Sequence, residues 1–233
     1  MASFRPRDYI APMAEAADWA ALTEARLLDA ALPHVPELGW TSRLVRRAAE
    51  IVGMTAPEAE LLLPHGARDV ATLFSHRQDA AALAALAQID PSGLKIRERI
   101  ARGVEARVEA AMADEAASRR LAGFLALPQN LALGTRLAWT SADAIWRWAG
   151  DTATDENHFS KRAILAGLLT STLLVRLSDP GAASQHLERG IEAVMAYERA
   201  KARFKLGDPA ATAAAFLGRI RHRRSPAARP TRA

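Results

Sequence analysis

The composition of this 233-residue chain and the spacing of its apolar residues predict an all-α fold. Half of the residues are hydrophobic but only 6% are aromatic, and alanine and leucine, which favour helices, recur throughout. No stretch alternates apolar and polar residues as a half-buried strand would. The length suits one large or two small domains with a sizeable buried core.

The first elements read as a three-helix unit. The first predicted helix begins at Asp18 as its N-cap, and its apolar residues then recur at helical spacing. Thr41 or Ser42 caps a second helix that Gly53 ends. Thr55 caps a short third helix, with a glutamate three positions after the cap. Long helix, turn, helix, glycine turn and short helix form the outline of the helix-turn-helix domain of TetR-type repressors.

A larger helical region follows. Turns rich in proline and glycine separate predicted helices over 67–88, 94–112, 114–127, 130–139, 142–148, 155–177 and 184–204. Ser141 is predicted to cap the helix over 142–148. We therefore expect four regions: a flexible N-terminus over 1–17, a helix-turn-helix-like region over 18–66, a helical binding and dimerisation domain over 67–205, and a linker, short amphipathic helix and basic tail over 206–233.

Charge and composition narrow the class of protein. The net charge is +5, but without the six arginines of residues 219–232 the rest of the chain carries −1. The body therefore lacks the basic surface of a general nucleic-acid binder. Cysteine is absent, which excludes disulfides and thiolate chemistry. The longest apolar run, 163–175, is shorter than the roughly 20 residues that span a bilayer and predicts a buried helix.

Four stretches resemble the Coq-nine family of ubiquinone-biosynthesis proteins over roughly residues 18–205. They are Leu27–Val35 with Gly39–Thr41, Leu63–Gly66, Leu94–Ile100 and Gly150–Asp155. The resemblance implies a TetR-like fold that no longer acts as a repressor, a homodimer joined through its last long helices, and no catalytic activity or cofactor. It further implies a protein that is peripheral on the inner membrane and binds isoprenoid ubiquinone precursors. The absence of cysteine fits a reducing cytosol, so we expect a cytoplasmic location. Such proteins present the precursor to the demethoxyubiquinone hydroxylase (Coq-seven).

The resemblance also implies a partner-binding patch at Asp155, His158, Phe159, Lys161 and Arg162. The family usually has tryptophan and tyrosine where this chain has His158 and Phe159. Aromatic anchors of this kind dominate many protein interfaces. The alternative is a simple helix start, in which Asp155 stabilises the amino end and the other side chains are solvated.

Two further sets of residues are candidates for lipid contact. The cavity-wall candidates, each of which also suits an ordinary core, are Phe124, Leu125, Leu127, Trp139, Trp146 and Leu168. Near the C-terminus, apolar residues fall on one helical face flanked by arginines, which is typical of a helix lying at a membrane surface. The membrane-contact candidates are Phe216, Leu217, Arg219, Ile220 and Arg221, although a solvated tail is the alternative.

A TetR-type regulator that responds to a hydrophobic ligand remains the alternative function. Its recognition helix would include Glu58 and Glu60 and no basic residue, which opposes contact with phosphates. Arg43, Arg46 and Arg47 on the preceding helix could offset this, so we expect no nucleic-acid partner but keep the alternative open. The six histidines are scattered without metal-ligand spacing, and no nucleophile or phosphate-loop motif occurs, so we expect neither metal nor catalysis.

Overall fold

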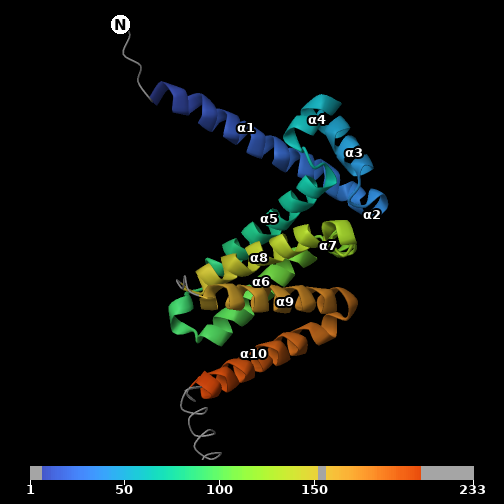
Figure 1. Ribbon diagram of the computed structural model, residues 1–233. Coiled ribbons are helices and arrows are strands. Elements are labelled where there is room, and N and C mark those ends of the chain that lie inside the picture. Colours follow the sequence, from blue (N-terminus) through green and yellow to red (C-terminus); the bar gives the residue numbers. More distant parts are fainter. Residues whose placement is uncertain (1–6, 152–155, 206–233) are drawn as a thin grey trace, which may run out of the picture. The chain divides into compact units, whose positions relative to one another are not determined.

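The computed structural model describes residues 7–151 and 156–205, and side chains over 19–151 and 158–196. Within these ranges the secondary structure consists of helices joined by turns, with no strand (Figure 1). This confirms the predicted all-α class. By its contacts the chain divides into two units, Met1–Glu188 and Arg189–Ala233. The TetR-like topology and the predicted boundary after residue 66 stay predictions.

The N-terminal elements are α1 (Arg7–Ala31), α2 (Val35–Leu38), α3 (Ser42–Val52) and α4 (Ala56–Leu62). Gly53 ends α3 with φ +77°, a left-handed conformation that glycine adopts without steric cost. At the start of α4, the Glu58 carboxylate accepts hydrogen bonds from the backbone N–H of Thr55 (2.8 Å) and from its hydroxyl (2.7 Å). The predicted caps at both positions are therefore confirmed.

The first helix begins at Arg7, so the prediction that Asp18 caps it is wrong. Residues 7–17 contain alanine, methionine and glutamate, all good helix formers, so the helix continues through this stretch. Pro12 lacks a backbone N–H and removes one hydrogen bond near the start of the helix. The predicted flexible N-terminus therefore includes a helical segment.

A hydrophobic core joins α1, α2, α3, α5 (Ala67–Leu86) and α7 (Glu115–Leu125). The indole of Trp40 lies 5.3 Å from the ring of Phe74, centroid to centroid, and its Nε1 donates to the carbonyl oxygen of Ala117 over 3.4 Å. Both aromatic side chains are almost completely buried. The fully buried members of this core, with no exposed surface, are Leu27, Ala31, Val35, Leu44, Ala48, Val70 and Ala71.

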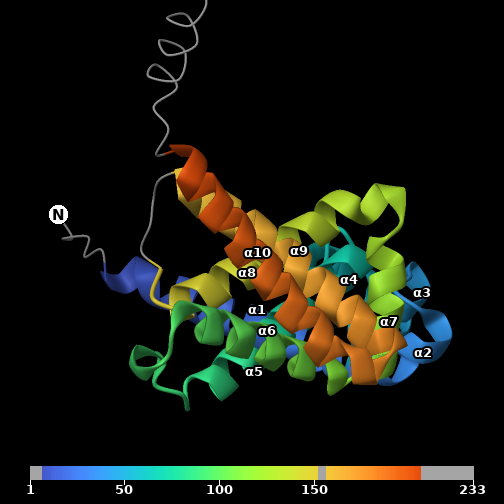
Figure 2. The same ribbon diagram turned by 90° about the horizontal axis from the view of Figure 1, so that it is seen from below.

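The remaining long helices of the first unit are α6 (Ile96–Met112), α8 (Leu131–Trp148) and α9 (Glu156–Ser178). Helix α5 packs against α6 and α8, and α9 packs against α8 and α6 (Figure 2). Gly103 of α6 lies so close to Ile145 of α8 that an added Cβ would clash with the isoleucine side chain. Glycine is therefore required for these two helices to approach as they do.

Helix α8 is continuous through Ser141, so the predicted break into 130–139 and 142–148 is wrong. Thr140 donates its hydroxyl to the carbonyl oxygen of Arg136 over 3.1 Å, within the helix. Ser141 donates instead to Asp79 of α5 over 2.6 Å. Because both hydroxyls find partners without capping a helix end, they do not interrupt it.

Helix α10 (Ala183–Lys205) begins in the first unit and continues into the second. The short turn before it, Pro180–Ala182, follows Asp179, whose carboxylate accepts from the backbone N–H of Gly181 over 3.2 Å. Within the first unit, His186 lies 3.0 Å from the hydroxyl of Ser171 on α9. The predicted amphipathic helix and basic tail lie outside the described residues.

Candidate functional site

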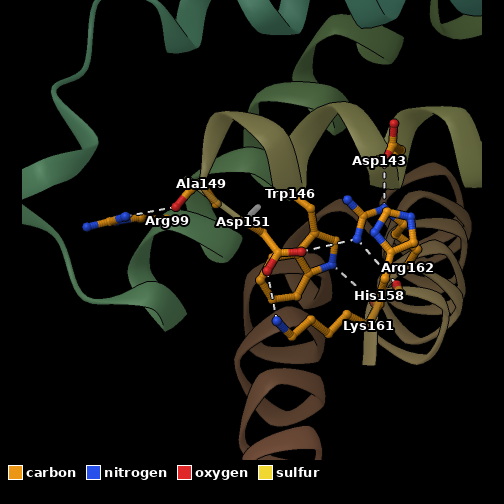
Figure 3. A network of polar contacts seen from close by, with 8 residues as sticks. All are labelled: Arg99, Asp143, Trp146, Ala149, Asp151, His158, Lys161 and Arg162. Atoms are coloured by element: carbon orange, nitrogen blue, oxygen red, sulfur yellow. Dashed lines mark hydrogen bonds and ion pairs between the residues drawn. The ribbon is translucent and has the colours of Figure 1, made fainter. Parts of the chain in front are cut away.

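Polar side chains gather where α8 ends and α9 begins (Figure 3). The chain leaves α8 at Gly150, whose φ of +87° is in the left-handed region that favours glycine. Asp151 then donates its backbone N–H to the carbonyl oxygen of Trp146 over 3.0 Å. Arg99 of α6 donates from Nη1 to the carbonyl oxygen of Ala149 over 2.8 Å. Backbone and side-chain donors together satisfy the carbonyls at the end of α8.

Arg162 of α9 is the centre of this network and is only 2% exposed. Its Nε donates to Oδ1 of Asp143 over 2.5 Å, and its Nη1 to Oδ2 of Asp151 over 3.1 Å. The same Nη1 lies 3.3 Å from the carbonyl oxygen of His158, one turn earlier in α9. Asp143 also pairs with the exposed Arg147 at 2.6 Å. Two carboxylates thus compensate a guanidinium that has been removed from water.

Lys161 extends the network to the surface. Its Nζ lies 2.8 Å from Oδ1 of Asp151 and 5.4 Å from the ring centroid of Trp146, within cation–π range. Burial raises the pKa of Asp151, but the hydrogen bonds and positive charges of Lys161 and Arg162 outweigh it and hold that pKa below its ordinary value of 3.8. Asp143, Asp151, Lys161 and Arg162 are called the α8–α9 clasp below.

Phe159 lies beside the clasp with 63% of its surface exposed. Its ring centroid is 6.1 Å from that of Trp139 on α8 and 5.3 Å from that of His158, which it meets edge-on. These separations are typical of favourable aromatic pairs. An exposed phenylalanine supported on one side by other rings has the form of an anchor for a partner.

The predicted partner-binding residues thus occupy different depths. Phe159 is exposed, whereas His158 is partly buried and Lys161 reaches the surface with a side chain 37% exposed. Arg162 is buried beneath them, where it holds α8 and α9 together. Asp155 lies outside the described residues.

The six cavity-wall candidates do not share one environment. Phe124 and Leu125 are partly buried against the core that includes Trp40 and Phe74. Leu127 is 43% exposed. Trp139 lies against Phe159, whereas Nε1 of Trp146 donates to the carbonyl oxygen of Lys161 over 3.1 Å. Leu168 is partly buried within α9. Their contact with lipid stays a prediction, as does that of residues 216–221, which lie outside the described residues.

Helix α4, which would be the recognition helix under the TetR-like prediction, exposes acidic groups. Glu58 and Glu60 are both exposed, and so is Leu61 at 86%. On α3, Arg43, Arg46 and Arg47 are exposed as well, and Arg47 pairs with Glu50 at 3.4 Å. The surface of α3 and α4 therefore carries both signs of charge.

In the part of the chain that the structure describes, no group of three or more histidine, aspartate or glutamate side chains is placed to hold a metal ion. Over the same residues, none of the helices combines the length and apolar character that crossing a bilayer requires.

Sequence reasoning missed the clasp as a structural unit. It selected Arg162 and Lys161 as surface residues and did not select Asp143, which is isolated among tryptophans and small residues. An acid in an apolar helical segment is itself a signal, because it needs a partner once buried. It also missed Arg99, although the segments containing Arg99 and Gly150 were two of the four that carried the family resemblance.

The fold and site define an all-α protein with an aromatic surface patch supported by a buried ion-pair clasp. Residues 131–198, which include both, match the COQ9 family model. The protein named Ubiquinone biosynthesis protein COQ9, mitochondrial, from Rattus norvegicus is 30% identical over 162 residues, which cover 66% of this chain and 51% of that protein. The protein of the same name from Xenopus tropicalis is 30% identical over 168 residues, which cover 67% of this chain and 51% of that protein.

The human protein of that name is 28% identical over 162 residues, which cover 66% of this chain and 50% of the human protein. This chain belongs to the COQ9 family. It spans about half the length of the curated relatives that it matches.

Proposed function

We propose that this chain is a non-catalytic, lipid-binding accessory protein of ubiquinone biosynthesis. Its relatives are named ubiquinone biosynthesis proteins, and their similarity to this chain is the observation that carries the proposal. In this proposal the protein binds an isoprenoid ubiquinone precursor and presents it to the demethoxyubiquinone hydroxylase. Such presentation would help the hydroxylase, because the apolar tail of the precursor otherwise keeps that substrate in the bilayer.

The docking surface for the hydroxylase is proposed at Phe159, with His158 and Lys161 around it. Phe159 offers a large apolar area whose burial would contribute to binding, and its contact with Trp139 limits the entropy lost when it is fixed. Arg162 acts from beneath, because its buried guanidinium positions the first turns of α9. It is a positioning residue rather than a contact.

A homodimer that lies peripherally on the inner membrane is part of the same proposal. On α9, Gly167 has no atom within 4 Å of the position where a Cβ would stand, and Leu174 is 50% exposed. A helix with an open glycine and an exposed leucine suits close approach by a helix of a second copy. Membrane contact is assigned to Phe216, Leu217, Arg219, Ile220 and Arg221 on their sequence pattern alone.

The lipid-binding part is tested by mass spectrometry of organic extracts from the purified protein. Isoprenoid quinones or their precursors should be enriched relative to a protein of similar size purified from the same cells. A variant truncated after Lys205 should retain the lipid but lose binding to anionic liposomes. Extracts without any isoprenoid would contradict the lipid-binding proposal.

The docking part is tested with Phe159→Ala and purified hydroxylase. Loss of an interface anchor weakens binding by about 30-fold or more, whereas loss of an exposed side chain leaves stability nearly unchanged. Leu61→Ala is the matched control, because Leu61 is exposed on α4 and should not affect the complex. Equal affinities for wild type and Phe159→Ala would place the docking surface elsewhere.

A further inference from the structure

A second buried ion pair lies between α5 and α6, outside the α8–α9 clasp. Oδ1 of Asp79 is 2.6 Å from Nε of Arg107, and the two side chains are only 11% and 8% exposed. Ser141 of α8 donates its hydroxyl to the same Oδ1 over 2.6 Å. Arg107 also donates from Nη2 to the hydroxyl of Ser75 over 3.3 Å. Three helices thus converge on one polar cluster.

This cluster has two polar atoms without a partner. Oδ2 of Asp79 and Nη1 of Arg107 are both buried, and neither has a hydrogen-bond partner among the described residues. An unsatisfied buried atom of a charged group is costly, and native structures contain few of them. The contrast with Arg162 is informative, because its Nε and Nη1 both reach carboxylates.

Apart from the hydroxyls of Ser75 and Ser141, buried apolar residues flank the pair along α5 and α6. Val104 and Val108 of α6 lie within one turn of Arg107 and are 0% and 4% exposed, and Ala82 of α5 is 3% exposed. The two atoms without a hydrogen-bond partner have opposite requirements, since Oδ2 of Asp79 accepts a hydrogen bond and Nη1 of Arg107 donates one. An anion would be repelled by the carboxylate and a cation by the guanidinium, whereas an apolar group would leave both atoms unsatisfied.

The complementary ligand is therefore a neutral group that carries a hydroxyl and a second, accepting oxygen. We propose that Asp79 and Arg107 form an internal polar site that binds the oxygen-substituted ring of the lipid, with a phenolic hydroxyl donating to Asp79 and a ring oxygen accepting from Arg107. This inference rests on the proposed lipid-binding function and adds to it that the ring, not only the apolar tail, is recognised.

The test compares two probes on two proteins. The probes are a short-chain prenylated methoxyphenol and the same molecule with hydrogen in place of the hydroxyl, and their affinities are measured by quenching of tryptophan fluorescence. The variant combines Asp79→Leu with Arg107→Met, since replacing both members of a buried ion pair by apolar residues is usually tolerated. It should bind the phenol about 10- to 100-fold more weakly than wild type does. Its affinity for the deoxy probe should change by about twofold or less.

The outcomes separate this inference from the function on which it rests. If wild type binds neither probe, the lipid-binding proposal fails and this inference fails with it. If the variant binds both probes as wild type does, or weakens both equally, lipid binding stands and the polar site is refuted. Arg102→Met with Glu105→Leu is the matched control, because that pair lies on α6 with side chains 61% and 49% exposed. It should leave both affinities unchanged.

A crystal structure of the wild-type protein with the methoxyphenol keeps the inference testable if the double variant does not fold. The expected result is a ring oxygen within hydrogen-bonding distance of Oδ2 of Asp79 or Nη1 of Arg107. Water alone at these two atoms, with the ring bound elsewhere, would overturn the proposal.

Discussion

The guanidinium of Arg162 reaches the carboxylate of Asp151 over 3.1 Å and so links the second turn of α9 to the residue that follows the turn at Gly150 after α8. The two residues are 11 positions apart, and Arg162 is 2% exposed. The same guanidinium also donates a hydrogen bond to Asp143, which lies within α8. The buried ion pairs of Arg162 therefore fix the part of α9 that carries Phe159. We expect the clasp to contribute both to stability and to docking.

Arg162→Met should destabilise the protein by about 3 kcal/mol, because it leaves two largely buried carboxylates with fewer partners. Urea unfolding followed by circular dichroism measures the loss. Arg119→Met is the control, since its pair with Glu115 is 55% and 50% exposed and should contribute about 0.5 kcal/mol or less. Equal losses in both variants would mean that burial does not strengthen the clasp.

Asp151 should make stability depend on acidity. Its pKa is lower in the folded protein than the ordinary 3.8, so the unfolded state binds protons more readily as the solution becomes acidic. The stabilisation by Asp151 is therefore complete above about pH 5 and is lost as the pH falls below 3.8 through the folded pKa. Urea midpoints should fall less steeply between pH 5 and pH 3 for Asp151→Asn than for wild type. Parallel pH profiles would contradict the assignment.

Gly103→Ala should destabilise the protein by about 1–3 kcal/mol, because the new methyl group meets the side chain of Ile145. Adding Ile145→Ala should make the combined cost smaller than the sum of the two single costs, as coupled neighbours require. Gly123→Ala on α7 is the control, since nothing lies within 4 Å of its added Cβ. It should stabilise the protein by about 0.5–1 kcal/mol, and thermal unfolding distinguishes the cases.

The two functions differ in their predictions about DNA: a TetR-type regulator should bind duplex DNA, whereas the proposed accessory protein should not. With Glu58 and Glu60 exposed on α4, we expect no binding to duplex DNA that weakens systematically with salt. Fluorescence anisotropy with labelled duplex at about 50 and 200 mM salt measures this. Salt-dependent binding that disappears when Arg43, Arg46 and Arg47 are replaced by alanine would support a repressor.

Several features of the protein follow from local sequence. The all-α class, the end of α3 at Gly53 and the capping of α4 by Thr55 and Glu58 were predicted correctly, because each depends on residues within a few positions of one another. The family was likewise accessible from short motifs. The start of α1 and the continuity of α8 were not predicted correctly, because Asp18 and Ser141 are residue types that often cap helices but lie inside α1 and α8.

The candidate sites depend on distance in space rather than in sequence. Asp143 and Arg162 are 19 positions apart, and Asp79 and Arg107 are 28 apart, so no helical periodicity relates them. Except for Asp143, whose apolar segment is a signal, these charges resemble ordinary solvated residues in the sequence, and only helix packing removes them from water. Burial then makes the choice of partner decisive, because an unpaired charge in the interior costs far more than one at the surface. Composition and short-range pattern determined which helices form, and only their packing decided which charges became the clasp and which side chain was left exposed above it.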